Sequence, residues 1–272
     1  MTEIDVQSNL KPEMVIRSLL EIAQTDEHYR RALDEIGNGP VNIAGLADVQ
    51  KAYLIQGMSH SLAASLTAVI VPDIVVARHL ADHLRALSPD VSDVLIWRSR
   101  DYAWTAMEAS SLAVEQERLG ILHRLNRLGH PDGERRLILV IVAQSLIQLI
   151  PPRPQMERLT TYISDDFTEG PDVLAERLTA AGYERVMKAE VPGQFARRGD
   201  IVDVIPVGLP ENQFGSGKGI GFRTSFFDTD VDLIRLYDIA SQRSIENVSA
   251  VRVPPAREIN LSADEALQLS QN

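Results

Sequence analysis

The chain has 272 residues, with 27 lysines and arginines against 38 aspartates and glutamates, and no cysteine. This length suits one large or two modest domains, and the lack of cysteine excludes disulfides and thiolate metal sites. The formal net charge of -11 argues against DNA as a direct ligand, because affinity for a phosphate backbone comes from positive charge that displaces counterions. No leader peptide and no apolar run of membrane length is evident, so we expect a cytoplasmic protein without membrane contact.

Residues 1–40 are predicted to form an N-terminal arm followed by helices. Apolar residues at helical spacing follow Pro12, and proline suits a first helical turn because its missing N–H needs no partner there. A second helix is predicted for Glu27–Ile36, with Gly37 as a left-handed cap.

Residues 41–155 are predicted to form a parallel α/β domain. Apolar runs at Leu66–Val71, Asp93–Trp97 and Leu137–Val142 read as strands, and amphipathic helices alternate with them, which predicts a parallel layer with helices on both faces. A long helix is expected over Ala109–Leu128. The helix that Pro72 and Asp73 open should bury a stripe of four apolar residues: Val76, Leu80, Leu84 and Leu87.

The start of this domain resembles a damaged phosphate-binding loop. A strand is expected at Val41–Ala44, followed by a turn at Gly45 and a helix. Against the pattern GxxxxGK[ST], Gly45 and Lys51 are in place, but Gln50 replaces the second glycine and Ala52 replaces the hydroxyl residue that would hold magnesium. A side chain at position 50 fills the space that phosphates need, which predicts that ATP does not bind.

Other catalytic and metal-binding patterns in this domain are also incomplete. A working ATPase needs an acidic pair at a strand end to organise magnesium and water, and none follows Leu137–Val142. His79 and His83 have the i, i+4 spacing of a metal pair, but Asp82 stands where a glutamate would be expected and no third ligand is evident. We therefore expect no catalytic residues, no cofactor and no metal. The enzymatic alternative is a nucleotide hydrolase that uses Lys51.

Residues 156–258 are predicted to form a smaller α+β domain. A helix at Pro171–Ala181 precedes short alternating runs from Glu190 to Ser244, which Gly, Asp and Pro turns separate, and this pattern is typical of an antiparallel sheet.

Alternation along Phe222–Phe227 places Phe222, Thr224 and Phe226 on one face of the strand and Arg223, Ser225 and Phe227 on the other. If the first set fills the core, Arg223 and Phe227 share the outer face, and an exposed arginine beside an exposed aromatic is typical of interface hot spots. The alternative is that Phe227 caps the sheet edge while Arg223 pairs with Asp228 or Asp230.

Several motifs occur in the order found in one family. The chain resembles the amino-terminal UvrB-homology module of the bacterial transcription-repair coupling factor over roughly residues 15–260. The motifs that carry the resemblance are Val71-Pro-Asp73, Gln144–Pro152, Gly182-Tyr183, Pro192–Asp203, Arg223–Arg235, Ser241–Ser244 and Pro255-Ala-Arg-Glu258.

The resemblance implies a non-catalytic relative of UvrB that recruits the damage-recognition ATPase UvrA. The family's UvrA-contacting positions carry over to Arg198, Arg223 and Phe227. In the family, RNA polymerase binding and ATP-dependent DNA translocation belong to later segments, so residues 259–272 are expected to begin a truncated following segment.

Two alternatives follow from the same resemblance. A stand-alone relative could act as a regulator that sequesters UvrA. A UvrB-like grip on DNA would need an inserted hairpin, for which the span Trp97–Glu115 leaves no room, so we expect weak DNA binding or none.

Overall fold

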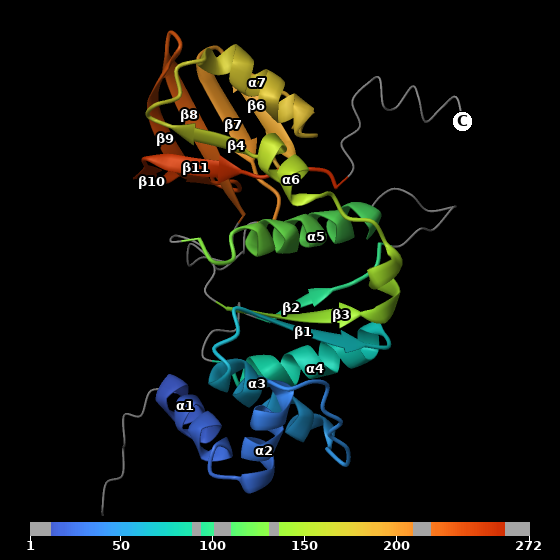
Figure 1. Cartoon of the computed structure of the whole chain (residues 1–272). Helices are drawn as coiled ribbons and strands as arrows, with labels where there is room; N and C mark the ends of the chain where they lie inside the picture. The colour runs from blue at the N-terminus through green and yellow to red at the C-terminus, as the bar shows by residue number, and fades with distance from the viewer. Residues whose placement is uncertain (1–11, 89–93, 101–109, 131–135, 209–218, 259–272) are drawn as a thin grey trace, which may run out of the picture. The chain divides into compact units, whose positions relative to one another are not determined.

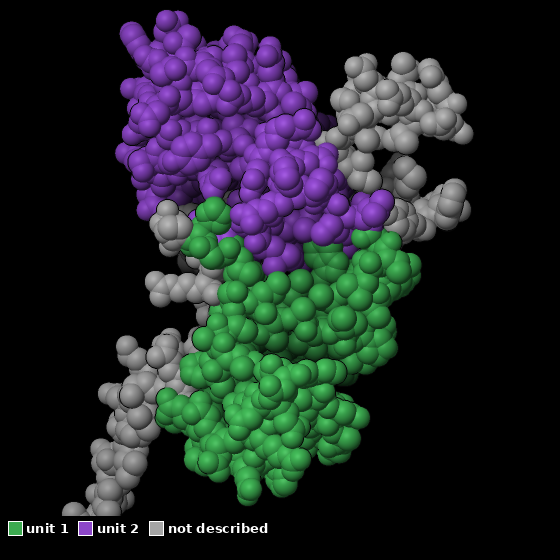
Figure 2. Space-filling view, in the orientation of Figure 1, with its two compact units in different colours: residues 1–99, 128–148 green, residues 100–127, 149–272 purple. Residues whose placement is uncertain are grey.

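The computed structural model describes residues 12–88, 94–100, 110–130, 136–208 and 219–258. The chain forms two compact units, residues 1–99 with 128–148 and residues 100–127 with 149–272 (Figure 2). Helix α5 (Ser110–Asn126) counts with the second unit, whereas the sequence-based division placed it in the first domain; that division into four segments stays a prediction. None of the helices in the described ranges is both long and apolar enough to cross a membrane.

The first unit opens with helices α1 (Pro12–Ala23) and α2 (Glu27–Ile36), which have the predicted start and bounds. The Asp26 carboxylate accepts a hydrogen bond from the Tyr29 N–H at 2.9 Å and so satisfies an unpaired donor of the first turn. Gly37 follows α2, but its φ of -63° is right-handed, so the prediction of a left-handed cap was wrong.

A three-stranded parallel sheet forms the centre of the first unit. Its strands β1 (Leu66–Val71), β3 (Leu137–Val142) and β2 (Val94–Trp97) lie in that order. All six residues of the central strand β3 are buried, which is why its sequence is a continuous apolar run rather than an alternating one. The predicted parallel α/β sheet is thereby confirmed, whereas helices on both of its faces stay a prediction.

Helices α3 (Asp48–Ser61) and α4 (Ile74–Ala86) lie together on one face of this sheet (Figure 1). Ala77, Ala81 and Leu84 are the buried residues of α4, while Val76 is 41% exposed. The predicted stripe was therefore wrong at Val76, because the two alanines, rather than the larger side chains, form the close contact with the core. The 3-10 helix η2 (Ala143–Ile147) follows β3.

The second unit contains helix α5 and an α+β arrangement (Figure 1). Its other helices are α6 (Arg153–Leu159) and α7 (Gly170–Ala180). Strands β4 (Thr161–Ser164) and β11 (Ala250–Val253) pair antiparallel as a two-stranded sheet.

The larger sheet of this unit has the order β10-β9-β8-β7-β6-β5. Its neighbours are antiparallel except for the pair β5 and β6, which is parallel. The strands are β5 (Glu184–Arg185), β6 (Gln194–Arg198), β7 (Ile201–Ile205), β8 (Ile220–Phe227), β9 (Asp230–Asp238) and β10 (Ser244–Val248). The predicted antiparallel sheet is confirmed.

One face of this sheet, here called the inner face, packs on helix α7 at strands β6 and β7. Arg197 of β6 reaches from this face to pair with Asp172 of α7. Phe226 makes an edge contact with Phe167, with ring centroids 6.1 Å apart. The buried residues of the inner face include Phe195, Val202, Val204, Phe222, Thr224, Phe226, Val231, Ile234 and Leu236. The opposite side is called the outer face below.

Helix α5 is joined to the end of the second unit by a buried ion pair. Arg118 and Glu258 both have fully buried side chains, with Nε and Oε1 2.5 Å apart, and Arg100 lies 3.4 Å from the same carboxylate. A Cβ built at Gly120 of α5 would lie 2.7 Å from the Gly208 Cα atom. Glycine is therefore required where α5 meets the chain that leaves β7.

We expect Glu258→Gln to lower the free energy of unfolding by about 3 kcal/mol, because glutamine keeps the shape of the side chain but removes the negative charge that faces the buried Arg118 guanidinium. Urea unfolding followed by circular dichroism measures this. The matched control is Arg257→Gln, whose half-exposed pair with Glu115 should contribute less than ~1 kcal/mol. Equal midpoints for the two variants would contradict the expectation.

Candidate protein-interaction surface

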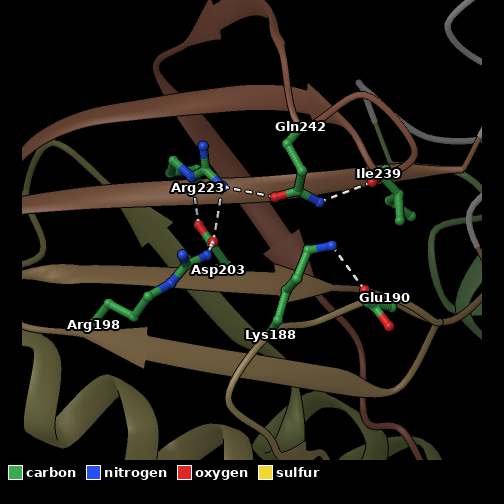
Figure 3. Close-up of polar contacts among 7 residues, drawn as sticks. All are labelled: Lys188, Glu190, Arg198, Asp203, Arg223, Ile239 and Gln242. Carbon is green, nitrogen blue, oxygen red and sulfur yellow. Dashed lines mark hydrogen bonds and ion pairs between the residues drawn. The ribbon is translucent and has the colours of Figure 1, made fainter.

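The outer face brings Arg198 and Arg223 together around one carboxylate, that of Asp203 (Figure 3). Asp203 lies in β7, directly opposite Arg223 of β8, and Arg198 closes the neighbouring strand β6. Arg223 donates from Nε to Oδ1 at 2.7 Å and from Nη2 to Oδ2 at 2.9 Å. Arg198 donates from Nη2 to Oδ2 at 3.0 Å. Three adjacent strands thus supply one ionic cluster.

Exposure differs sharply within this cluster. The side chain of Asp203 is 3% exposed, that of Arg223 is 20% exposed and that of Arg198 is 56% exposed. A buried carboxylate is tolerated when charged donors satisfy its oxygens. Hydrogen bonding to Asp203 is the main reason that the pKa of Arg223 is raised above its usual value. Asp203 therefore holds both arginines, while more than half of the Arg198 side chain and one fifth of the Arg223 side chain stay exposed.

Arg223 is also held from two other sides. Its guanidinium carbon lies 4.7 Å from the centroid of the Tyr237 ring, a cation–π distance. The Tyr237 ring can lie this close to the sheet because Gly221 has no side chain: a Cβ at Gly221 would lie 2.4 Å from the ring. Burial is the main cause that raises the pKa of Tyr237 to about 12.

Gln242 closes the third side of Arg223. Its Oε1 atom accepts from Arg223 Nη2 at 3.2 Å, and its Nε2 atom donates to the Ile239 carbonyl at 2.8 Å (Figure 3). Gln242 has a φ of 60°, a left-handed conformation that costs free energy in a residue with a Cβ. These two hydrogen bonds favour that conformation, so Arg223 has little freedom to lose when it binds.

Phe227 ends strand β8 with its side chain 80% exposed, whereas Phe226 is 7% exposed. The predicted alternation of faces is therefore confirmed, with Phe222, Thr224 and Phe226 buried and Arg223 partly open. The alternative in which Arg223 pairs with Asp228 or Asp230 was wrong, because its carboxylate partner is Asp203.

The sequence interpretation did not identify Asp203 as part of the site. One signal was available: Asp203 sits between Ile201 and Ile205 on a single face of its strand, where an isolated carboxylate needs a partner. The arginine that it meets is decided by the pairing register between neighbouring strands, and the sequence of a single strand does not specify that register.

The predicted nucleotide loop lies in the first unit. Gly45 has a φ of 82° and helix α3 begins at Asp48. Val41–Ala44 forms no strand, so that prediction was wrong. A strand needs a hydrogen-bonded neighbour, and β1, not this segment, is the edge strand of the sheet. The amine of Lys51 lies 2.9 Å from the Asp48 carboxylate, and this contact is the main reason that the pKa of Asp48 is lowered.

His79 and His83 lie on helix α4. Within the described ranges no group of three or more histidine, aspartate or glutamate side chains gathers at a spacing suited to a metal ion.

The chain combines an α/β unit with an α+β unit, and the antiparallel sheet of the second unit presents arginines and an exposed aromatic residue. This composition is typical of protein-interaction surfaces, so the fold and the surface together define the class of protein-interaction modules. Residues 167–259 match the family model of the UvrB interaction domain. The larger antiparallel sheet and its outer face lie within this match.

Most of the chain is similar to transcription-repair coupling factors. It is 29% identical over 234 residues to that of Bacillus subtilis, which covers 82% of this chain and 18% of the relative. It is 27% identical over 194 residues to that of Haemophilus influenzae, an alignment that covers 71% of this chain and 15% of the relative. It is 26% identical over 190 residues to that of Escherichia coli, with 70% of this chain and 15% of the relative covered. The family resemblance drawn from the sequence is therefore confirmed, and the chain spans less than one fifth of the length of these relatives.

Proposed function

We propose that this chain is a non-catalytic interaction module that recruits UvrA through Arg198, Arg223 and Phe227, and that it thereby links stalled transcription to nucleotide excision repair. One observation carries the proposal: two arginines converge on a single buried carboxylate on the same sheet face as an exposed phenylalanine. The match of residues 167–259 to the UvrB interaction domain supports it.

Preorganisation favours this function over a merely structural role. An arginine that is fixed before binding loses little side-chain entropy when a partner docks. An aromatic ring that is 80% exposed contributes little to the fold, and burying it against a partner would remove apolar area from water.

Titration calorimetry of UvrA with the whole chain tests the proposal. We expect saturable binding in the micromolar range or tighter. Failure to form a complex by both calorimetry and size-exclusion chromatography would overturn it. Duplex DNA is the second titrant, and we expect it to bind weakly or not at all, as the acidic balance of the chain suggests.

We infer that the chain binds no ATP. Lys51 is already paired with Asp48. Position 50 is a glutamine where the phosphate-binding pattern has a glycine, and its side chain accepts a hydrogen bond from the Ala47 N–H at 2.9 Å. A ligand present at 100 times its Kd stabilises a protein by about 2.7 kcal/mol. We therefore expect no change in melting temperature with millimolar ATP and magnesium, for the wild type and for Lys51→Ala alike. A shift that Lys51→Ala removes would restore the hydrolase alternative.

A further inference from the structure

The middle of the outer face carries a third arginine, Arg235 of β9. It lies directly opposite Arg223 in the antiparallel register of β8 and β9, and Cβ atoms of such pairs are about 5 Å apart. Asn247 of β10 lies opposite Arg235 on its other side. The sheet thus sets Asp203, Arg223, Arg235 and Asn247 in one row across four strands.

The charges in this row do not balance. The Asp203 carboxylate is shared by Arg198 and Arg223, and the side chain of Arg235 makes no hydrogen bond or ion pair with any part of the chain that the structure describes. Its remaining same-face neighbours on β9, Leu233 and Tyr237, carry no negative charge. Like charges directly opposite each other in a sheet are destabilising. The row therefore retains positive charge beside Arg223 that nothing in the described chain neutralises.

Two exposed acidic residues lie at the end of the sheet where β8 turns into β9. Asp228 is exposed in the turn that follows Phe227, and Asp230 is exposed at the start of β9, directly opposite Phe227. The outer face therefore has an acidic tip, an exposed aromatic next to it and a basic middle. A partner whose charges complement this arrangement must place its own acidic group over the middle, next to the pocket that receives the aromatic ring.

We propose that Arg235 is a further contact of this surface and that it receives an acidic side chain of UvrA, an inference that rests on the proposed function. A protein carboxylate fits better than a nucleic-acid phosphate for two reasons. The uncompensated charge is local, and the chain as a whole carries a net charge of -11, which repels a polyanion but leaves a short acidic segment able to dock.

The test compares Arg235→Gln and Arg235→Glu with the wild-type chain, titrating UvrA at about 50 mM and 200 mM salt. We expect Arg235→Gln to weaken binding about 5-fold at low salt and to reduce its salt dependence, because a partly exposed ion pair is worth up to about 5-fold in affinity. Arg235→Glu should weaken binding further, since it places a carboxylate against a carboxylate. Both variants should melt at or above the wild-type temperature, because they relieve the repulsion with Arg223.

Arg252→Gln is the matched control, since Arg252 is an exposed arginine on β11, in the other sheet of the same unit, and should leave binding unchanged. If Arg223→Ala abolishes binding while Arg235→Gln matches the wild type at both salt concentrations, the inference is wrong and the proposed function stands. If the wild-type chain does not bind UvrA, both fail together. Retention of duplex DNA that Arg235→Gln removes would show that the group bound is a phosphate and would overturn the inference.

Discussion

Alanine at Arg223 or at Phe227 should each weaken binding of UvrA by about 30-fold or more, which corresponds to the ~2 kcal/mol that defines a hot spot. For Phe227 the loss comes from apolar area that the partner no longer covers, since the ring is 80% exposed in the free chain. For Arg223 it comes from a guanidinium that Asp203, Tyr237 and Gln242 hold ready. Titration calorimetry measures both.

The two variants differ in what they do to the fold, and this difference controls for misfolding. Phe227→Ala should melt at the wild-type temperature, because an exposed ring contributes little to stability. Arg223→Ala leaves the buried Asp203 carboxylate with Arg198 as its remaining arginine partner, so its melting temperature should fall. Arg223→Lys keeps the charge but loses the bidentate geometry, and it should bind more weakly than the wild type while folding better than Arg223→Ala.

Undiminished binding by both alanine variants would remove this surface as the UvrA contact. Loss of binding by Arg223→Ala alone would be ambiguous if that variant were also unfolded at the working temperature. The Phe227→Ala result resolves the ambiguity, because that variant keeps the fold and removes only the exposed ring.

Apolar runs predicted two strands of the parallel sheet, although β3 is buried throughout and β1 is not. Leu66–Val71 and Leu137–Val142 match strands β1 and β3 to the residue, because apolar runs of strand length bounded by polar residues have few alternatives. Face alternation in Phe222–Phe227 held because one face of the strand is buried, which fixes the side chains that point inward.

The predictions failed where tertiary contacts decide which residues form a strand or face the core. Val41–Ala44 is apolar enough for a strand but has no sheet partner. Val76 fits the helical stripe, yet Ala77 and Ala81 form the contact because small residues allow a closer approach to the core. Local pattern cannot report which of two adjacent positions meets a neighbouring element.

The candidate site shows the same limit. Its arginines and its aromatic were predicted from a resemblance and from alternation, but the carboxylate that organises them was not, since Asp203 meets Arg223 across 20 residues of sequence through the register of β7 and β8. Arg235 enters the same row only because β9 continues that register.

Asp203→Asn should weaken UvrA binding by about 10-fold, although it raises the net positive charge of the outer face. The substitution keeps the shape of the side chain but removes the charge that both arginines share. Arg198 and Arg223 then repel each other and Arg235, and Arg223 loses the charge-assisted bonds that hold it over Tyr237. The guanidinium groups spread over more conformations, and the entropy of fixing them must be lost on binding.

Whether Asp203→Asn weakens or strengthens UvrA binding distinguishes two roles for the arginines. If they acted only as mobile positive charges, Asp203→Asn would strengthen binding to an acidic partner and steepen its salt dependence. If Asp203 positions them, binding weakens. The free energy of unfolding should also fall, by about 2 kcal/mol, less than for a fully buried pair because Arg223 is 20% exposed.

Calorimetry and urea unfolding on the same preparations measure both effects. Asp200→Asn is the matched control: Asp200 lies in the turn between β6 and β7, where its carbonyl accepts from the Phe226 N–H at 2.8 Å while its exposed side chain makes no ion pair within the described chain. It removes the same charge near the same face without releasing either arginine. Tighter binding by Asp203→Asn than by Asp200→Asn would show that Asp203 masks the arginines rather than positioning them.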